Sequence, residues 1–306
     1  MNFFADFSGL GAWFAACTRS ARTMKTPLMT NTTQTCLIGC LLGSLAVPAF
    51  AQRASDDVPP VTTAPAGEYA VMRGVQGPAG MVSARVLLDI NLSDGLAGKP
   101  VSLAPDLYYS PTDKLQLGVL HQGPMGWQTR PGPGICLTGA NDGCPKVYDN
   151  IGFDLMYGLA FGGLHLSAHG SLFVNSFDTG STSVAVGVAA KAHLSDRVAL
   201  FFDPKIAIAV SERDASNDDA LYIPVELEYQ AAPRTVLKLL SGVSGYFTDF
   251  GDNYQVPVGV GLVQNLNSHF DLGARFSFDN LLGSQVDGGP GRGDARSLAI
   301  LLNIRS

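Results

Sequence analysis

Residues 150–159 read Asn-Ile-Gly-Phe-Asp-Leu-Met-Tyr-Gly-Leu. Every second position, from Ile151 to Leu159, holds a large apolar side chain, and the positions before and between them hold Asn, Gly, Asp, Met and Gly. Successive side chains of a strand point to opposite faces of a sheet. A period of two therefore predicts a β-strand with one apolar face.

The same alternation recurs along the chain and predicts twelve strands. They span residues 82–92, 101–109, 115–122, 149–159, 164–175, 182–193, 198–210, 220–230, 235–246, 254–264, 269–279 and 297–305. Most of these stretches are longer than the roughly 5–6 residues of an ordinary soluble strand and match the roughly 9–11 residues of a tilted strand that crosses a bilayer. Strand length therefore favours a transmembrane barrel over a soluble sheet.

The gaps between these stretches alternate in length. Gaps after even-numbered stretches are short and contain turn-forming residues, such as Gly162-Gly163 and Ala232-Pro233. Gaps after odd-numbered stretches are longer, and the longest covers residues 123–148. All short turns then lie at one end of an antiparallel sheet, as in barrels with short periplasmic turns and longer outer loops. We expect an all-β fold, a closed antiparallel up-and-down transmembrane β-barrel of about 12 strands.

Composition excludes several other classes of protein. Charged residues are 15% of the 306 residues, hydrophobic residues are 46%, and the net charge is −6. High apolar content with a small net charge argues against intrinsic disorder, and no segment after the export signal approaches the roughly 18 apolar residues of a spanning helix. Basic residues do not cluster, so we expect no nucleic acid as a partner. We find no phosphate-binding glycine motif and no zinc-type ligand set, and we expect no cofactor and no metal.

The N-terminal region has the features of an export signal. From Met24 the chain runs through Lys, Thr and Pro to an apolar stretch at 37–47, and Ala49-Phe50-Ala51 fits a signal-peptidase site. We therefore expect residues 1–51 to be an upstream extension plus a signal peptide, with cleavage after Ala51. The alternative is a buried or anchoring helix at 37–51, but its apolar core is short for a span.

Two stretches, Leu107–Leu115 and Leu194–Leu200, each combine a strand, a tight turn and the start of the next strand. With the strand pattern and the export signal, they make residues 82–306 resemble bacterial outer-membrane β-barrel proteins of the porin-like kind, with no subfamily identified. The resemblance implies a location in the cell outer membrane of a Gram-negative bacterium. It also implies contacts with outer-membrane lipids and lipopolysaccharide, assembly by the barrel-assembly machinery, and residues 52–81 as a periplasmic N-terminal linker.

The strand face opposite the apolar face should line the lumen. It carries twelve charged residues, six of each sign, and we predict that they line the lumen: Arg85, Asp89, Asp154, Lys191, Asp203, Lys205, Glu226, Glu228, Lys238, Asp271, Arg275 and Arg305. Twelve strands lie between the roughly 8 that side chains fill and the roughly 16–18 of open porins. This predicts a narrow passive channel for small hydrophilic solutes with little ion selectivity. The alternative is a structural membrane protein with a salt-bridge ladder and no transport.

One local disulfide is expected in the longest gap. Cys136 and Cys144 are the two cysteines that follow the export signal. An even pair that is close in sequence in an exported protein is typical of a disulfide. A loop of this length is usually functional or mobile. It either folds inward to constrict the lumen or stays on the surface.

Catalytic motifs are weak, and we expect the protein not to be an enzyme. His165 and His169 share a strand face but lie roughly 13 Å apart along it, too far to share a metal. Ser171 lies near His169, but no orienting acid is singled out for a triad. Two rival interpretations remain. One is an outer-membrane enzyme of the lipase or protease kind, and the other is a soluble secreted β-sandwich binding protein, which would bury its apolar strand faces.

Three prolines, Pro204, Pro224 and Pro257, fall inside predicted strands. Proline cannot donate a ladder hydrogen bond, and a closed barrel has no free edge that would tolerate it. We therefore expect each of them at a bulge or at a strand end.

Overall fold

The computed structural model describes residues 70–93, 100–121, 134–138, 146–215, 217–284 and 291–306. The expected signal peptide, its cleavage site and Cys144 lie outside the described residues. No helix among the residues described is long and apolar enough to cross a membrane.

Most of the described chain is strand. The strands are β1 (Val82–Asn91), β2 (Val101–Thr112), β3 (Leu115–Leu120), β4 (Ile135–Cys136), β5 (Ile151–Ala160), β6 (Leu164–Ser176), β7 (Ser181–Ser195), β8 (Val198–Phe202), β9 (Lys205–Ala209), β10 (Ala220–Ala232), β11 (Thr235–Tyr246), β12 (Val258–Asn265), β13 (Phe270–Phe278) and β14 (Arg296–Arg305). The helices are η1 (Ala70–Met72), η3 (Arg213–Ala215) and α3 (Phe250–Asn253).

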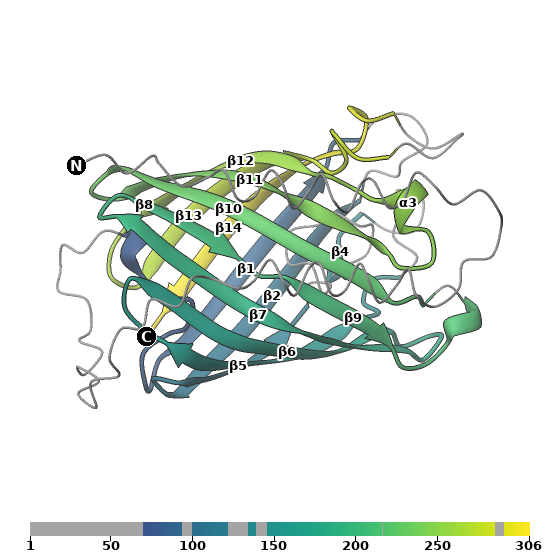
Figure 1. Ribbon diagram of the computed structural model, residues 1–306, viewed down its shortest axis with the longest axis horizontal. Coiled ribbons are helices and arrows are strands. Elements are labelled where there is room, and N and C mark those ends of the chain that lie inside the picture. Colours follow the sequence, from purple (N-terminus) through teal and green to yellow (C-terminus); the bar gives the residue numbers. More distant parts are fainter. Residues whose placement is uncertain (1–69, 94–99, 122–133, 139–145, 216, 285–290) are drawn as a thin grey trace, which may run out of the picture. The chain divides into compact units, whose positions relative to one another are not determined.

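These strands form one closed antiparallel barrel (Figure 1). Strands that follow one another along the chain are paired, and β1 pairs with both β2 and β14, which closes the ring. β8 and β9 lie between the same two neighbours, β7 and β10, and form one interrupted strand. The two-residue β4 pairs with the part of β2 that lies beyond the end of β3. The predicted barrel of twelve wall strands is therefore confirmed.

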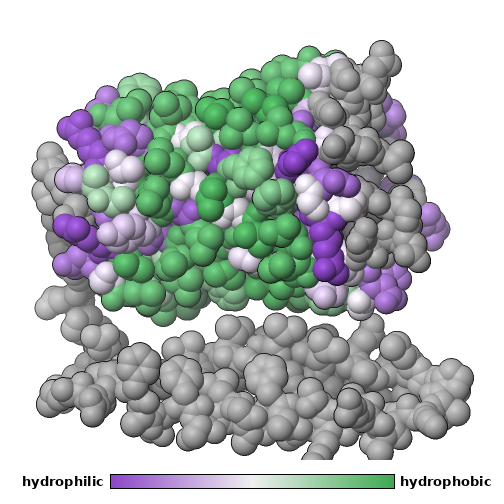
Figure 2. All heavy atoms as spheres, turned by 90° about the horizontal axis from the view of Figure 1, so that it is seen from above, coloured by the Kyte–Doolittle hydropathy of each residue, from purple (hydrophilic) through white to green (hydrophobic). Residues whose placement is uncertain are grey.

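Burial in this barrel is inverted relative to a soluble protein. Large apolar side chains point outward and stay exposed, as for Leu155 at 46% and Leu272 at 44%. The alternate positions are buried and include charged side chains such as those of Asp154 and Lys191. Figure 2 shows the apolar side chains as a band between two hydrophilic ends. Lipid tails solvate such a band. The β-sandwich interpretation, which buries these side chains between two sheets, is excluded by the closed barrel.

One end of the barrel, here called the short-turn end, carries the short connections between strands. These are residues 113–114, 161–163, 196–197, 233–234 and 266–269. The start of β1 lies at this end too, because the backbone N–H of Ser306 donates to the carbonyl of Val82. In barrels of this kind the short turns face the periplasm.

Two of the three prolines lie where the sequence predicted. Pro204 lies in the interruption between β8 and β9, and Pro257 directly precedes β12. Pro224 corrects the expectation, because it lies inside β10. Its carbonyl accepts the N–H of Asp203 at 3.4 Å, so its nitrogen faces the same side, toward the interruption. No ladder bond is needed there, which explains why a closed wall tolerates this proline.

The interruption also requires glycine at position 187 of β7. An added Cβ at Gly187 would lie 2.0 Å from the carbonyl oxygen of Pro204. We expect Gly187→Ala to lower the free energy of unfolding by about 1–3 kcal/mol, the cost of overpacking. The urea midpoint in lipid vesicles, followed by gel mobility of unboiled samples, measures it. Gly170→Ala on β6 is the control, since its nearest contact is 3.9 Å. Equal midpoints for the two variants would contradict the expectation.

Candidate functional site

The candidate site is the inner face of the barrel wall. Strand alternation places the twelve predicted charged residues on the face opposite the exposed apolar side chains, eleven of them in strands and Asp203 in the β8–β9 interruption. The structure brings ten of these residues into ion pairs. The other two, Asp89 and Arg275, have no ion pair among the described residues.

One cluster surrounds His169 of β6. Its ring nitrogens lie 2.8 Å from carboxylate oxygens on both sides, Nε2 from Asp154 and Nδ1 from Asp203. Ser171 donates to Asp154 at 2.6 Å, and Lys205 lies 2.9 Å from Asp203. An ionised carboxylate only accepts hydrogen bonds, so two carboxylates beside one ring favour a proton on each ring nitrogen. The cluster thus places two basic side chains against two carboxylates, with residues from β5, β6 and the interrupted strand β8–β9.

A second cluster joins β7, β10 and β11. Lys191 lies 2.6 Å from Glu228, and Lys238 lies 2.9 Å from Glu226 and 2.7 Å from Glu228. Glu228 therefore serves two lysines, and Lys191 has no other ion pair among the described residues. This asymmetry makes Glu228 the central residue of the cluster.

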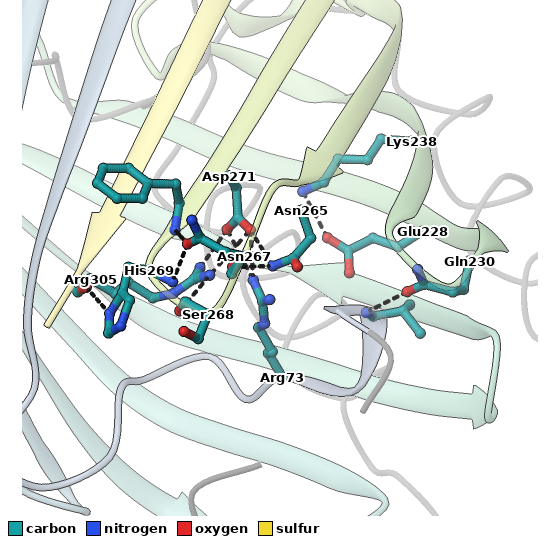
Figure 3. A network of polar contacts seen from close by, with 12 residues as sticks. Arg73, Glu228, Gln230, Lys238, Asn265, Asn267, Ser268, His269, Asp271 and Arg305 are labelled. Carbon is teal, nitrogen blue, oxygen red and sulfur yellow. Dashed lines mark hydrogen bonds and ion pairs between the residues drawn. The ribbon is translucent and has the colours of Figure 1, made fainter. Parts of the chain in front are cut away.

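A third cluster centres on Asp271 of β13, near the short-turn end (Figure 3). Arg305 of β14 pairs with Asp271, and the side-chain amide of Asn265 donates to it at 2.8 Å. Arg73, from the segment before β1, also donates to Asp271 at 2.9 Å. Arg73 lies in the stretch 52–81 that was expected to be a linker, so this contact was not predicted.

A fourth cluster contains a residue that sequence reasoning missed. Arg85 donates at 2.9 Å to Asp106, which has 0% of its surface exposed, and at 2.6 Å to the hydroxyl of Tyr108. The backbone N–H of His121 donates to the same carboxylate at 2.7 Å. The signal was present, because Asp106 shares the alternate positions of its stretch with Ser102, and that face was predicted to be the inner one.

Asp89 and Arg275 are the two predicted residues without an ion pair among the residues that the structure describes. Asp89 Oδ1 and Arg275 Nε are buried and have no hydrogen-bond partner there. Both residues are in register with Ala299 of β14, one on each side. Ala299 is too small to fill the space between them, so a pair of opposite charges faces the lumen across a small side chain.

The structure gives no support to the weak catalytic motif. Ser171 donates to Asp154 and makes no hydrogen bond with His169 in the described structure. The ring of His165 lies 5.2 Å from the ring of His193, between centroids, and not beside His169. No group of three metal-ligating side chains occurs within the described ranges. Cys136 is disulfide-bonded, but Cys144 is not among the described residues, so their pairing stays a prediction.

Comparisons with known proteins bear on the fold. An outer-membrane channel from Pseudomonas putida is similar, with a TM-score of 0.51 and 15% identity over 76% of this chain and 97% of that chain. The chain has the fold of an outer-membrane channel. The porins KdgM and NanC have TM-scores of 0.48 each, with 6% and 8% identity, and cover 72% and 74% of this chain and 98% of their own. No family model and no curated protein sequence matches.

Proposed function

We propose that the protein is an integral outer-membrane channel for the passive passage of small hydrophilic solutes. The observation that carries this proposal is the pair Asp89 and Arg275, without ion-pair partners in the described structure, inside a barrel whose outer face is apolar. The two side chains attract each other at longer range, but Asp89 Oδ1 and Arg275 Nε have no hydrogen-bond partner in the described structure. Because burying such groups dry costs several kcal/mol, we expect water beside them. Water inside the wall and lipid outside it are the two requirements of a membrane channel.

The charges of the inner face favour weak ion selectivity. The predicted set holds six cations and six anions, and the structure adds one of each sign, Arg73 and Asp106. Rings of one sign of charge select ions, whereas a balanced lining does not. Neutral and zwitterionic solutes are therefore the expected cargo.

Recording from planar bilayers tests the channel. We expect discrete conductance steps and a reversal potential near zero in a salt gradient. Arg275→Ala removes a cation and should move the reversal potential toward cation preference. Asp89→Ala removes an anion and should move it toward anion preference. Shifts in the same direction would contradict a lumen lined by both residues.

A second candidate is a structural membrane protein. It is favoured by the pairing of the other ten predicted charges with one another or with neighbouring side chains. In that case the charges stabilise the wall and no solute crosses. Recording decides between the two, because a correctly folded barrel that shows no conductance steps supports the structural role.

The location and the membrane partners are tested separately from the channel. The apolar band supports contacts with outer-membrane lipids and lipopolysaccharide, and the barrel fold supports assembly by the barrel-assembly machinery. We expect the protein to fractionate with outer membranes and to resist a salt wash. Unboiled samples should also differ in gel mobility from boiled ones. Release by salt would contradict an integral protein.

A further inference from the structure

Residues 70–81, here called the mouth strap, cross the short-turn end of the barrel. At one side the N–H of Val71 donates to Gln230 of β10 at 3.0 Å, and at the other the N–H of Gly77 donates to Gln116 of β3 at 3.0 Å. The strands β10 and β3 lie on opposite sides of the ring in the strand order. The mouth strap therefore spans the opening instead of following its rim.

The mouth strap covers the inner wall that it crosses. Its helix η1 contacts β8, β10 and β11, and Val71 is 0% exposed. Beneath it, Gln230 is 1% exposed and Val236 of β11 is 3% exposed. Figure 3 shows the Arg73 side chain reaching toward Asp271. The mouth strap thus covers this part of the inner wall and crosses the short-turn opening.

The mouth strap is held less firmly than the wall strands are held to one another. Only Val71 and Gly77 of its residues are buried. Its end next to β1 is tied to β2 and to the turn that follows β2, through backbone bonds of Gly80 and Met81 with Ser110 and through bonds of Ala79 and Gln76 with residues 113–114. Farther from β1 it shares no row of ladder hydrogen bonds with a wall strand, and its hydrogen bonds are isolated ones to Gln116, Asp271 and Gln230. A segment with few buried apolar contacts and isolated hydrogen bonds opens before the rest of a fold.

The wall keeps its ion pairs and several of its hydrogen bonds when the mouth strap leaves. Asp271 retains its ion pair with Arg305 and its hydrogen bond from Asn265. The amide nitrogen of Gln230 retains the carbonyl oxygen of Ala232 at 2.6 Å. On release, the side-chain oxygen of Gln230 exchanges the N–H of Val71 for water, and both the docked and the released arrangements are compatible with a closed barrel.

We infer that the mouth strap is a built-in closure of the lumen. Docked, it blocks the short-turn mouth, and released, it turns about Gly80, whose φ of +81° marks the bend before β1, and opens the path. This inference rests on the channel function proposed above and adds a closed state and an open state to it.

A release variant tests the closure in the full-length protein. Val71→Asp with Arg73→Glu places a carboxylate in the buried η1 contact and another beside Asp271, so both anchors are repelled. We expect a severalfold larger single-channel conductance than in the native protein. Arg213→Glu is the matched control, because it breaks a comparable arginine–aspartate pair, with Asp219, away from the mouth strap and the lumen. It should leave the conductance unchanged.

A reporter cysteine detects displacement of the mouth strap by chemical labelling, independently of any conductance measurement. Val236→Cys keeps a small side chain under η1, and a membrane-impermeant thiol reagent added at the short-turn side should label it only in the release variant. Gel mobility of unboiled samples confirms folding. Should the double variant not fold, Arg73→Ala alone removes one anchor. It should increase both the conductance and the labelling of Val236→Cys, by less than the double variant would.

The outcomes separate the two proposals. Equal, nonzero conductance in the native protein and the release variant, with labelling only in the latter, would overturn the closure and keep the channel. Silence in all variants, with labelling switched on in the release variant, would overturn the channel and the closure that rests on it. Labelling of Val236→Cys in an otherwise native protein would show that the mouth strap is not docked and would also overturn the closure.

Discussion

Replacing Leu155 with arginine is expected to lower the free energy of unfolding of the barrel by about 2–4 kcal/mol, the cost of a charge facing lipid at the membrane midplane. Leu155 lies in the middle of β5, and its side chain is 46% exposed on the outer apolar face. An arginine there must either sit among lipid tails or distort the wall to reach water. Urea titration of the protein folded in lipid vesicles measures the loss.

Leu164→Arg is the depth control for this prediction. Leu164 is 41% exposed on the same outer face but begins β6, beside the short turn at 161–163. Near the membrane surface the cost of arginine falls to about 0–1 kcal/mol. A neutral result at Leu155, or an equal loss at both positions, would mean that the outer face is not solvated by lipid.

Glu228→Ala is expected to cost about 3 kcal/mol of stability, the lower end of the range for breaking a buried ion pair, since water in the lumen can partly rehydrate the lysines. The change leaves Lys191, which is 6% exposed, without its carboxylate at 2.6 Å. An unpaired buried ammonium group is much more costly than the loss of one hydrogen bond. The same urea titration in vesicles applies.

Glu226→Ala is the matched control, because it removes a carboxylate from the same cluster and leaves every lysine paired. Lys238 loses Glu226 but keeps Glu228 at 2.7 Å. We expect a clearly smaller loss of stability than for Glu228→Ala. Should the Glu226 variant prove the less stable of the two, the assignment of Glu228 as the central residue would be wrong.

The strands of the barrel wall were predictable because residues close together in the sequence determine their faces and their ends. The alternation around Leu155 sets which face of a strand is apolar, and turn residues such as Gly162-Gly163 set where strands end. The place of Pro224 was not predictable in this way. It depends on an interruption in a neighbouring strand. The residue pattern within one strand does not indicate where its neighbour is interrupted.

The mouth strap was missed for a related reason. Residues 70–81 are rich in Gly and have no period, so they read as part of a linker. Their order comes from contacts with distant residues, such as Val71 with Gln230 and Arg73 with Asp271. Asp106 was missed despite a usable signal, since only the pairing register of β1 with β2 places it opposite Arg85.

The pairing of β1 with β14 has a consequence for how the protein folds. Its register runs from Ser83 opposite Arg305 to Asn91 opposite Ser297, so the seam joins the two ends of the barrel sequence. Such a contact has the largest loop-closure entropy in the molecule, and topologies dominated by distant pairings fold slowly. Until β14 emerges and docks, the nascent sheet keeps two unpaired edges, which are sites of aggregation. The pairing of β1 with β14 is therefore the step at which a chaperone or assembly factor would have the greatest effect.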